Sequence, residues 1–135
     1  MDISSQQKFP PEFMPHFEGL GKKVVCFPRC LDCGQFHWYP MPLCPYCRSS
    51  SIEWKAVAGH TRLYSWTVVH HAFSASLSDL VPYVVALVVF DDAPNVRLVT
   101  NLKMEDHQDF QINMLLQPVF HDDQSNFHKV TFRPI

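Results

Sequence analysis

Two pairs of cysteines are the residues whose type and spacing most clearly indicate chemistry in this sequence. Cys30 with Cys33 and Cys44 with Cys47 each have the form C-x-x-C, and ten residues separate the pairs. Each pair folds as a tight knuckle that directs two thiolates to one centre, and two knuckles supply the four sulfurs of a tetrahedral zinc site. Because all four ligands come from the protein, no position stays open for water. The pattern therefore predicts a structural Zn²⁺ and not a catalytic one.

The fifth cysteine and the glycine after the first pair give two further expectations. Cys26 lies outside the pattern, and an odd number of cysteines argues against a disulfide framework. We expect Cys26 to be a buried thiol on a strand. Gly34 directly follows the first knuckle and can adopt the positive φ that such a turn often needs. Iron in a rubredoxin-like site, and free or disulfide-linked thiols, remain alternatives to zinc.

Short elements flank the cysteine pairs. Pro10 and Pro11 predict the start of a helix, on which Phe13, Phe17 and Leu20 recur at i, i+4 and i+7 and so share one face. A short strand is expected at 22–27, before the first pair, and another at 52–57, after the second. The segment with the two cysteine pairs is thus expected to lie between two short strands.

From Thr61 onward, the sequence pattern predicts β-strands. The run 83–90 is almost continuously apolar, which suits a strand buried on both faces. A turn is expected at 91–95, and the strand after it would form a hairpin with 83–90. Segment 72–80 is expected to be a loop or one helical turn, and 105–110 a helical turn. Five strands with such an insertion predict a small closed barrel. The expected strands are 62–69, 83–90, 96–102, 115–120 and 129–132.

The composition limits the classes of partner. The 135-residue chain has 11 Lys and Arg against 13 Asp and Glu, a formal net charge of −2. Proteins that bind nucleic acids usually carry a basic surplus, so this balance argues against a nucleic-acid partner. The apolar run 84–90 is too short to cross a membrane, and residues 1–8, expected to be disordered, lack a secretory signal. We therefore expect a cytoplasmic protein.

Several motifs, by their order and spacing, resemble the DUF35 family over almost the whole chain. The resemblance implies a mainly β fold with a short N-terminal helix, a rubredoxin-like zinc ribbon and a five-stranded OB-fold barrel. It also implies a lead and helix at 1–25, a ribbon at 26–57 and a barrel at 58–135. The matching pieces are FEGL at 17–20, the two cysteine pairs with Gly34, IEW at 52–54, AG at 58–59, LYSWTVV at 63–69, PYVVALV at 82–88 and FRP at 132–134.

The same resemblance implies an accessory role. Members of this family are similar to small subunits that bind thiolase-superfamily enzymes, as in acetyl-CoA thiolase with HMG-CoA synthase, steroid side-chain aldolases and the phloroglucinol acyltransferase complex. It implies a non-catalytic subunit that orders thiolase-like or ketosynthase-like partners and lines a path for an acyl-CoA or an acyl intermediate. Two departures concern loops. The family often has a second Gly near His60, and it usually has Gly where Asn113 stands, although Asn tolerates a left-handed turn.

Seven residues are candidates for contacts with a ligand or partner. Aromatic side chains on the helix and in the loop between the knuckles either pack within the chain or face another protein, since exposed apolar patches usually mark an interface. Arginines near the barrel, together with Lys103, are candidates for the phosphates of CoA. The candidates are Phe13, Phe17, Trp38, Arg62, Phe73, Tyr83 and Arg97.

Single-stranded nucleic-acid binding is the first alternative function. OB-fold barrels bind single strands through basic grooves and exposed aromatics. Arg62, Arg97 and Arg133 would supply the cluster of positive charge.

An independent hydrolase or transferase is the second alternative. The paired carboxylates Asp91 with Asp92 and Asp122 with Asp123 fall in expected turns, and His70 and His71 are adjacent, so they face opposite sides of a strand. We therefore assign no catalytic residue.

Overall fold

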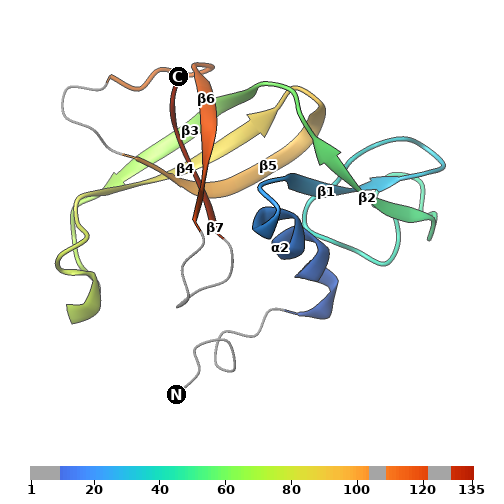
Figure 1. Cartoon of the computed structure of the whole chain (residues 1–135), viewed down its shortest axis with the longest axis horizontal. Helices are drawn as coiled ribbons and strands as arrows, with labels where there is room; N and C mark the ends of the chain where they lie inside the picture. The colour runs from blue at the N-terminus through green and yellow to red at the C-terminus, as the bar shows by residue number, and fades with distance from the viewer. Residues whose placement is uncertain (1–9, 104–108, 122–128) are drawn as a thin grey trace.

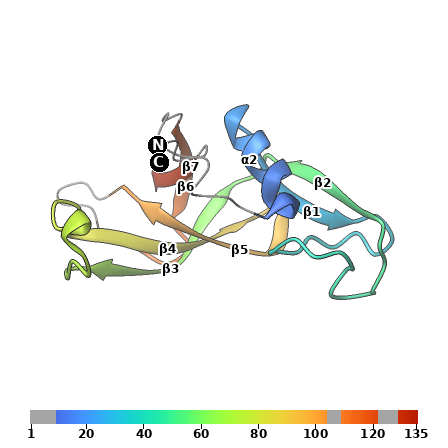
Figure 2. The same ribbon diagram turned by 90° about the horizontal axis from the view of Figure 1, so that it is seen from below.

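A short helix and a two-stranded sheet lie beside a five-stranded closed barrel (Figure 1). This computed structural model describes residues 10–103, 109–121 and 129–135. The helix and small sheet sit at one end of the molecule, and the loop between the first two barrel strands lies at the other end (Figures 1 and 2). Within the described ranges, no helix is long and apolar enough to cross a membrane.

The N-terminal helix is built as its sequence predicts. A 3-10 turn, η1 (Pro11–Phe13), leads into α2 (Met14–Gly21), and proline occupies the first turn of each, where its missing N–H costs no hydrogen bond. The helix packs closely on the next strand, because a Cβ on Gly19 would lie 3.0 Å from the Cys26 sulfur. Lys23, with φ 62°, turns the chain out of the helix.

The small sheet pairs β1 (Val25–Cys30) with β2 (Ile52–Val57) in antiparallel register from Val25↔Val57 to Cys30↔Ile52. The expectation for β2 is confirmed, whereas β1 lies three residues later than expected. The reason is the left-handed Lys23, which delays extended backbone until Val25. The two strands therefore carry the chain directly into and out of the zinc ribbon.

The barrel order is β3-β4-β5-β7-β6, and β6 pairs back with β3 to close it. The closed five-stranded barrel predicted from the sequence is confirmed, and β4 lies where it was expected. The seam between β5 and β7 is parallel and rests on the single pair Leu102↔Phe132. The strands are β3 (Thr61–Val69), β4 (Tyr83–Phe90), β5 (Ala93–Leu102), β6 (Leu115–His121) and β7 (Lys129–Pro134).

Strand β4 corrects one prediction. Its apolar run suggested burial on both faces, but only alternate residues are buried, among them Val84, Val88 and Phe90. Residues of the other set, such as Val85 and Leu87, point outward and are only partly covered. The sequence of β4 is continuously apolar because one face of the strand fills the barrel core while its other face forms an apolar outer surface.

The turn after β4 is shorter than expected. Only Asp91 and Asp92 form it, and β5 already begins at Ala93, so Pro94 and Asn95 are strand residues. Proline is tolerated here because the β4–β5 register shifts next to it, between Val89 and Phe90.

Three further expectations concern loops. Gly34 has φ 77° and Asn113 has φ 72°, so both adopt the left-handed conformation expected of them. Segment 72–80 is a loop that includes one helical turn, η2 (Ala75–Leu77). The lead at 1–8, expected to be disordered, and the turn expected at Asp122 and Asp123 lie outside the described residues, as does most of the helical turn expected at 105–110.

Candidate metal centre and binding surfaces

The four cysteine sulfurs converge on one point. All four Sγ atoms lie within 4.8 Å of one another. Cys30 and Cys47 are 3.5 Å apart, and Cys33 and Cys44 are 3.6 Å apart. Zn–S bonds of about 2.3 Å in a tetrahedron would place the sulfurs roughly 3.8 Å apart. The cluster therefore has the size of a tetrathiolate zinc site.

Backbone N–H groups of the knuckles point at the sulfurs, as a thiolate site requires. Cys33 N donates to Cys30 Sγ and Tyr46 N donates to Cys44 Sγ, both at 3.4 Å. These contacts stabilise negative charge on the two buried sulfurs. The Ser49 hydroxyl, next to the second knuckle, donates to the Asp32 carboxylate in the first and so ties the knuckles together.

The pKa shifts of the clustered thiols agree with a site that binds a cation. The backbone N–H of Cys33 is the main cause that lowers the pKa of Cys30 to about 6. The Ser49 backbone N–H also lowers the pKa of Cys47, but burial and the neighbouring thiols together raise it to about 12. Without a metal, the cluster cannot hold four thiolates at neutral pH, because each added charge repels the others.

The donor set and its geometry fit structural zinc. Four sulfur ligands fill a tetrahedral coordination shell, so the metal has no open position for water or substrate. Cys30 and Cys44 are buried, while Cys33 and Cys47 face solvent at the ribbon surface. Zn²⁺ bound here fixes the ribbon and takes no part in a reaction.

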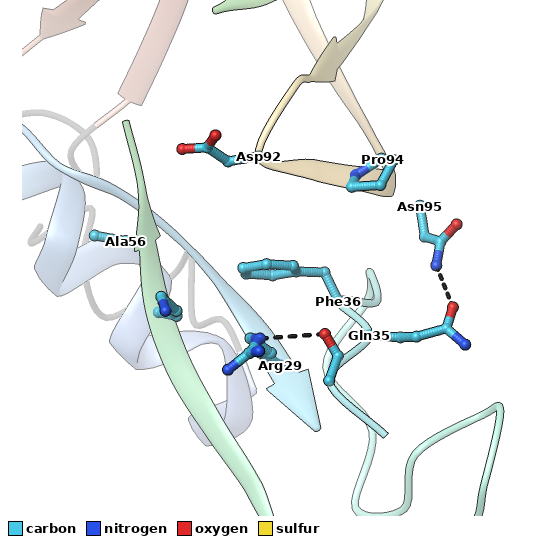
Figure 3. Close-up of a pocket in the computed structure, with 9 residues that line it drawn as sticks. Arg29, Gln35, Phe36, Ala56, Asp92, Pro94 and Asn95 are labelled. Atoms are coloured by element: carbon cyan, nitrogen blue, oxygen red, sulfur yellow. Dashed lines mark hydrogen bonds between the residues drawn. The ribbon is translucent and has the colours of Figure 1, made fainter. Parts of the chain in front are cut away.

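A pocket of about 550 Å³ with both polar and apolar lining residues lies where the ribbon meets the barrel (Figure 3). The buried ring of Phe36 lies at its centre, between Arg29 of β1 and the start of β5. Two hydrogen bonds brace it: Arg29 Nε donates to the Gly34 carbonyl at 3.1 Å, and Asn95 Nδ2 donates to Gln35 Oε1 at 2.6 Å. The second bond links the ribbon loop directly to β5.

The paired carboxylates at this junction have structural roles. The Asp92 Oδ2 atom accepts the backbone N–H groups of Ala58 and Gly59 at 3.1 and 2.8 Å. A Cβ on Gly59 would lie 2.5 Å from the other carboxylate oxygen of Asp92, so a larger residue there would have to displace that carboxylate. Asp91 pairs with Arg62 at 3.0 Å. These aspartates therefore hold the linker and strand β3, and neither is arranged as a general acid.

An aromatic groove of about 450 Å³ brings together three of the candidate contact residues, Phe13, Phe17 and Trp38. The rings of Phe13 and Trp38 meet edge to face, with centroids 5.7 Å apart. Residues 98–101 of β5 and 130–131 of β7 form the opposite side. No Asp, Glu, Lys or Arg is among the described lining residues, so the groove suits an uncharged, apolar ligand.

His16 lies at the base of this groove and is 4% exposed. Its Nδ1 atom donates to the Cys26 carbonyl at 2.9 Å, which leaves the unprotonated lone pair on Nε2. Its ring centroid is 4.7 Å from that of Trp38 and 5.7 Å from that of Phe27. Burial lowers the pKa of His16 below its usual value, so the imidazole is neutral at pH 7.

The other candidate residues do not join the aromatic groove. Arg62 and Arg97 lie in one row across β3, β4 and β5, on either side of Val89. Arg62 is paired with Asp91, and the Arg97 guanidinium lies 4.5 Å from the Tyr64 ring centroid.

Three more residues are scattered over the barrel. Phe73 is 78% exposed in the distal loop, where it contacts the ring of His71. Tyr83 begins β4, and Arg133 lies on β7, so Arg133 does not share the row of the other two arginines. A basic cluster formed by these three arginines stays a prediction.

Sequence reasoning missed His16 and the role of Asp92 in capping the linker. His16 follows Phe13 by three residues and so shares the apolar helix face, which is the signal that was available. Asp92 gave no local signal, because the backbone groups that it binds are distant in the sequence.

Comparison with known proteins extends this picture. Residues 25–53 match the model of the ChsH2 rubredoxin-like zinc ribbon domain, and residues 54–121 match that of the ChsH2 C-terminal OB-fold domain. A DUF35 domain-containing scaffold protein of Methanothermobacter thermautotrophicus is 30% identical over 69 residues, which cover 50% of this chain and 51% of that protein. The chain thus spans about half the length of this curated relative.

Two solved structures share the fold. The structure described as the Ltp2-ChsH2(DUF35) aldolase superposes with a TM-score of 0.78 and 29% identity, over 93% of this chain and 96% of that one. A DUF35 protein of unknown function from Sulfolobus solfataricus gives a TM-score of 0.68 at 13% identity, over 99% and 93% of the two chains, and shares the fold alone. With its tetrathiolate zinc ribbon followed by a five-stranded barrel, this chain belongs to the DUF35 family, in its ChsH2-like branch.

Proposed function

We propose that this chain is a non-catalytic accessory subunit of a thiolase-like enzyme complex, in which it orders the larger enzyme. The main support is its likeness to the DUF35 chain of the Ltp2-ChsH2 aldolase, which extends over nearly the full length of both chains. The name of the archaeal relative, a scaffold protein, agrees with the same role.

The chemistry of the described residues supports a role without catalysis. The zinc ligands fill the metal's coordination shell, and Asp91 and Asp92 are engaged in structural contacts. His16 is held by a backbone carbonyl inside an aromatic cluster. In this proposal, the catalytic groups belong to the partner.

The aromatic groove is the proposed ligand surface of the complex. Phe13, Phe17 and Trp38 give it an uncharged lining, which suits the acyl part of an acyl-CoA or of an acylated intermediate. Arg62 remains a proposed contact for the phosphates of CoA, and Arg97 a proposed contact with the partner, although each already has a partner within the chain. Phe73 and Tyr83 are proposed as contacts with the partner outside the groove.

The test is co-expression with the thiolase-like subunit encoded nearest to this chain in the same genome. We expect the two chains to co-elute in size-exclusion chromatography with light scattering, and the partner to gain acyl-CoA turnover that this chain lacks alone. Separate elution combined with salt-sensitive binding to an oligonucleotide would contradict the proposal and support the nucleic-acid alternative. Acyl-CoA turnover by the purified chain alone would contradict it in favour of an independent enzyme.

A further inference from the structure

The outer face of strands β3, β4 and β5 is an apolar surface that the barrel core does not use. Ser65, Leu87 and Val99 form one row across the three strands, and Thr67, Val85 and Asn101 form the next. A shallow hollow of about 330 Å³ lies over these rows. Val99 is 54% exposed at its edge. We call this surface, formed by Ser65, Thr67, Val85, Leu87 and Val99, the outer barrel face.

The outer barrel face is continuous with the aromatic groove, because Val99 lines both. On the other side of Val99, the groove contributes the side chains of Phe13, Trp38 and Tyr39, of which Tyr39 is 56% exposed. An apolar surface therefore extends from the N-terminal helix and ribbon loop across β5 to the middle of the barrel. Contiguous exposed apolar surfaces of this kind usually mark a protein interface.

One positive charge borders this surface. Arg97 precedes Val99 by two residues and so projects from the same face of β5. Within the described ranges it has no carboxylate within ion-pair distance, and its guanidinium stacks on Tyr64 instead. The nearby Arg62 differs, because Asp91 neutralises it. The described lining of the hollow and of the groove includes no acidic side chain.

We infer that the outer barrel face, together with Arg97, is the surface that docks the enzyme subunit of the proposed complex. The occupant is a folded protein surface with an apolar ridge that fits over Val99 and Leu87 and a carboxylate that meets Arg97. This inference rests on the proposed function and adds to it the location and chemistry of the contact.

A second copy of this chain fits the same surface poorly. In a two-fold contact centred on Val99, each Arg97 would meet the same face of the other copy. Among the described residues, the carboxylate beside that face is Asp91, which Arg62 already neutralises, so both Arg97 guanidinium groups would be partly desolvated without a free counter-charge. Charge complementarity therefore favours a different protein as the occupant.

The experiment measures binding of purified variants to the thiolase-like subunit from the same genome by co-elution and by titration calorimetry. Val99→Glu places a charge in the apolar contact and should raise Kd at least about 30-fold, as expected for a buried hot-spot position. Arg97→Glu should raise Kd about tenfold and remove the salt dependence of the association rate. Ile112→Glu is the matched control, since Ile112 is apolar and 64% exposed but does not line the outer barrel face or the groove. It should bind like the wild type.

The binding and oligomeric state of the wild type and of Val99→Glu distinguish three outcomes. If the wild type binds and Val99→Glu, with unchanged melting temperature and zinc content, binds equally well, the docking surface is wrong and the proposed function stands. If the wild type does not bind, the proposed function itself fails. If the wild type alone is a dimer that Val99→Glu converts to a monomer, the occupant is a second copy and the inference is overturned.

Discussion

The ribbon and the barrel of this chain are stabilised in different ways. In the ribbon, four sulfurs lie within 4.8 Å of one another, while several of its apolar side chains, such as Leu31, Met41 and Leu43, are exposed. In the barrel, side chains such as Phe132, Val84 and Val88 are fully buried. A short chain segment that cannot bury enough apolar surface needs a metal, whereas the barrel closes around its own core.

Loss of the metal should have the largest effect and should separate the two regions. We expect Cys44→Ser to abolish zinc binding and unfold the ribbon, because binding of structural zinc contributes on the order of 10 kcal/mol to such modules. Hydrogen exchange should increase throughout the ribbon while the central strand β4 stays protected. Equal loss of protection in β4 would show that the barrel also depends on the metal.

A substitution in the barrel core should destabilise the barrel rather than the ribbon. Phe132 is fully buried and forms the single pair that joins β7 to β5. Phe132→Ala should lower the free energy of unfolding of the barrel by about 3–5 kcal/mol through the cavity it leaves. Denaturant titration followed by the fluorescence of the barrel Trp66 would measure this, after replacement of Trp38 and Trp54 by Phe in both variants. Ile135→Ala, at a position 74% exposed, is the control and should change little.

The contact between the regions should have an intermediate effect. Asp92→Ala removes the acceptor of two linker N–H groups and should cost about 1–3 kcal/mol. It should also separate the unfolding of the ribbon from that of the barrel. A calorimetric transition as cooperative as that of the wild type would contradict the proposed coupling.

The smallest expected effect is on the pH dependence of the free energy of unfolding. Burial lowers the pKa of His16 in the folded state below its unfolded value of about 6.5, so the unfolded chain binds a proton that the folded chain does not. The resulting stability is fully present above pH 6.5 and is lost as the pH falls through and below that value. The slope is at most about 1.4 kcal/mol per pH unit for one proton.

His16→Phe should reduce this slope between pH 7.5 and 5.5. The slope is obtained for each protein from free energies of unfolding measured at pH 7.5 and at pH 5.5 in the same zinc buffer. Burial also lowers the pKa of His37, so some slope should remain in the variant. An unchanged slope in His16→Phe would show that His16 does not contribute.

The parts that the sequence predicted well depend on local patterns. The C-x-x-C spacing predicted the metal site because the geometry of each knuckle is set within four residues. β-Branched and aromatic content located β3, and a continuous apolar run located β4, each within a residue of its observed start. Gly34 and Asn113 marked left-handed turns, since few other residues adopt that conformation.

The errors came from contacts that no local pattern contains. The turn before β5 was predicted too long because Pro94 is usually a turn residue, but the register shift beside it admits proline into the strand. The run of β4 suggested two buried faces, since the sequence cannot distinguish a second buried face from an exposed apolar one. His16 was overlooked because its partner is a carbonyl ten residues away, on β1.

By itself, the sequence determined a tetrathiolate site, a short leading helix and a set of strands sufficient for a small barrel. Only the tertiary structure decided which side chains share a surface. It brought Phe13 and Trp38 against β5, placed Val99 between the groove and the outer barrel face, and left Arg97 without a carboxylate in the described part of the chain. The physical reason is that bond geometry and side-chain periodicity act over a few residues, whereas surfaces form from segments that only folding brings together.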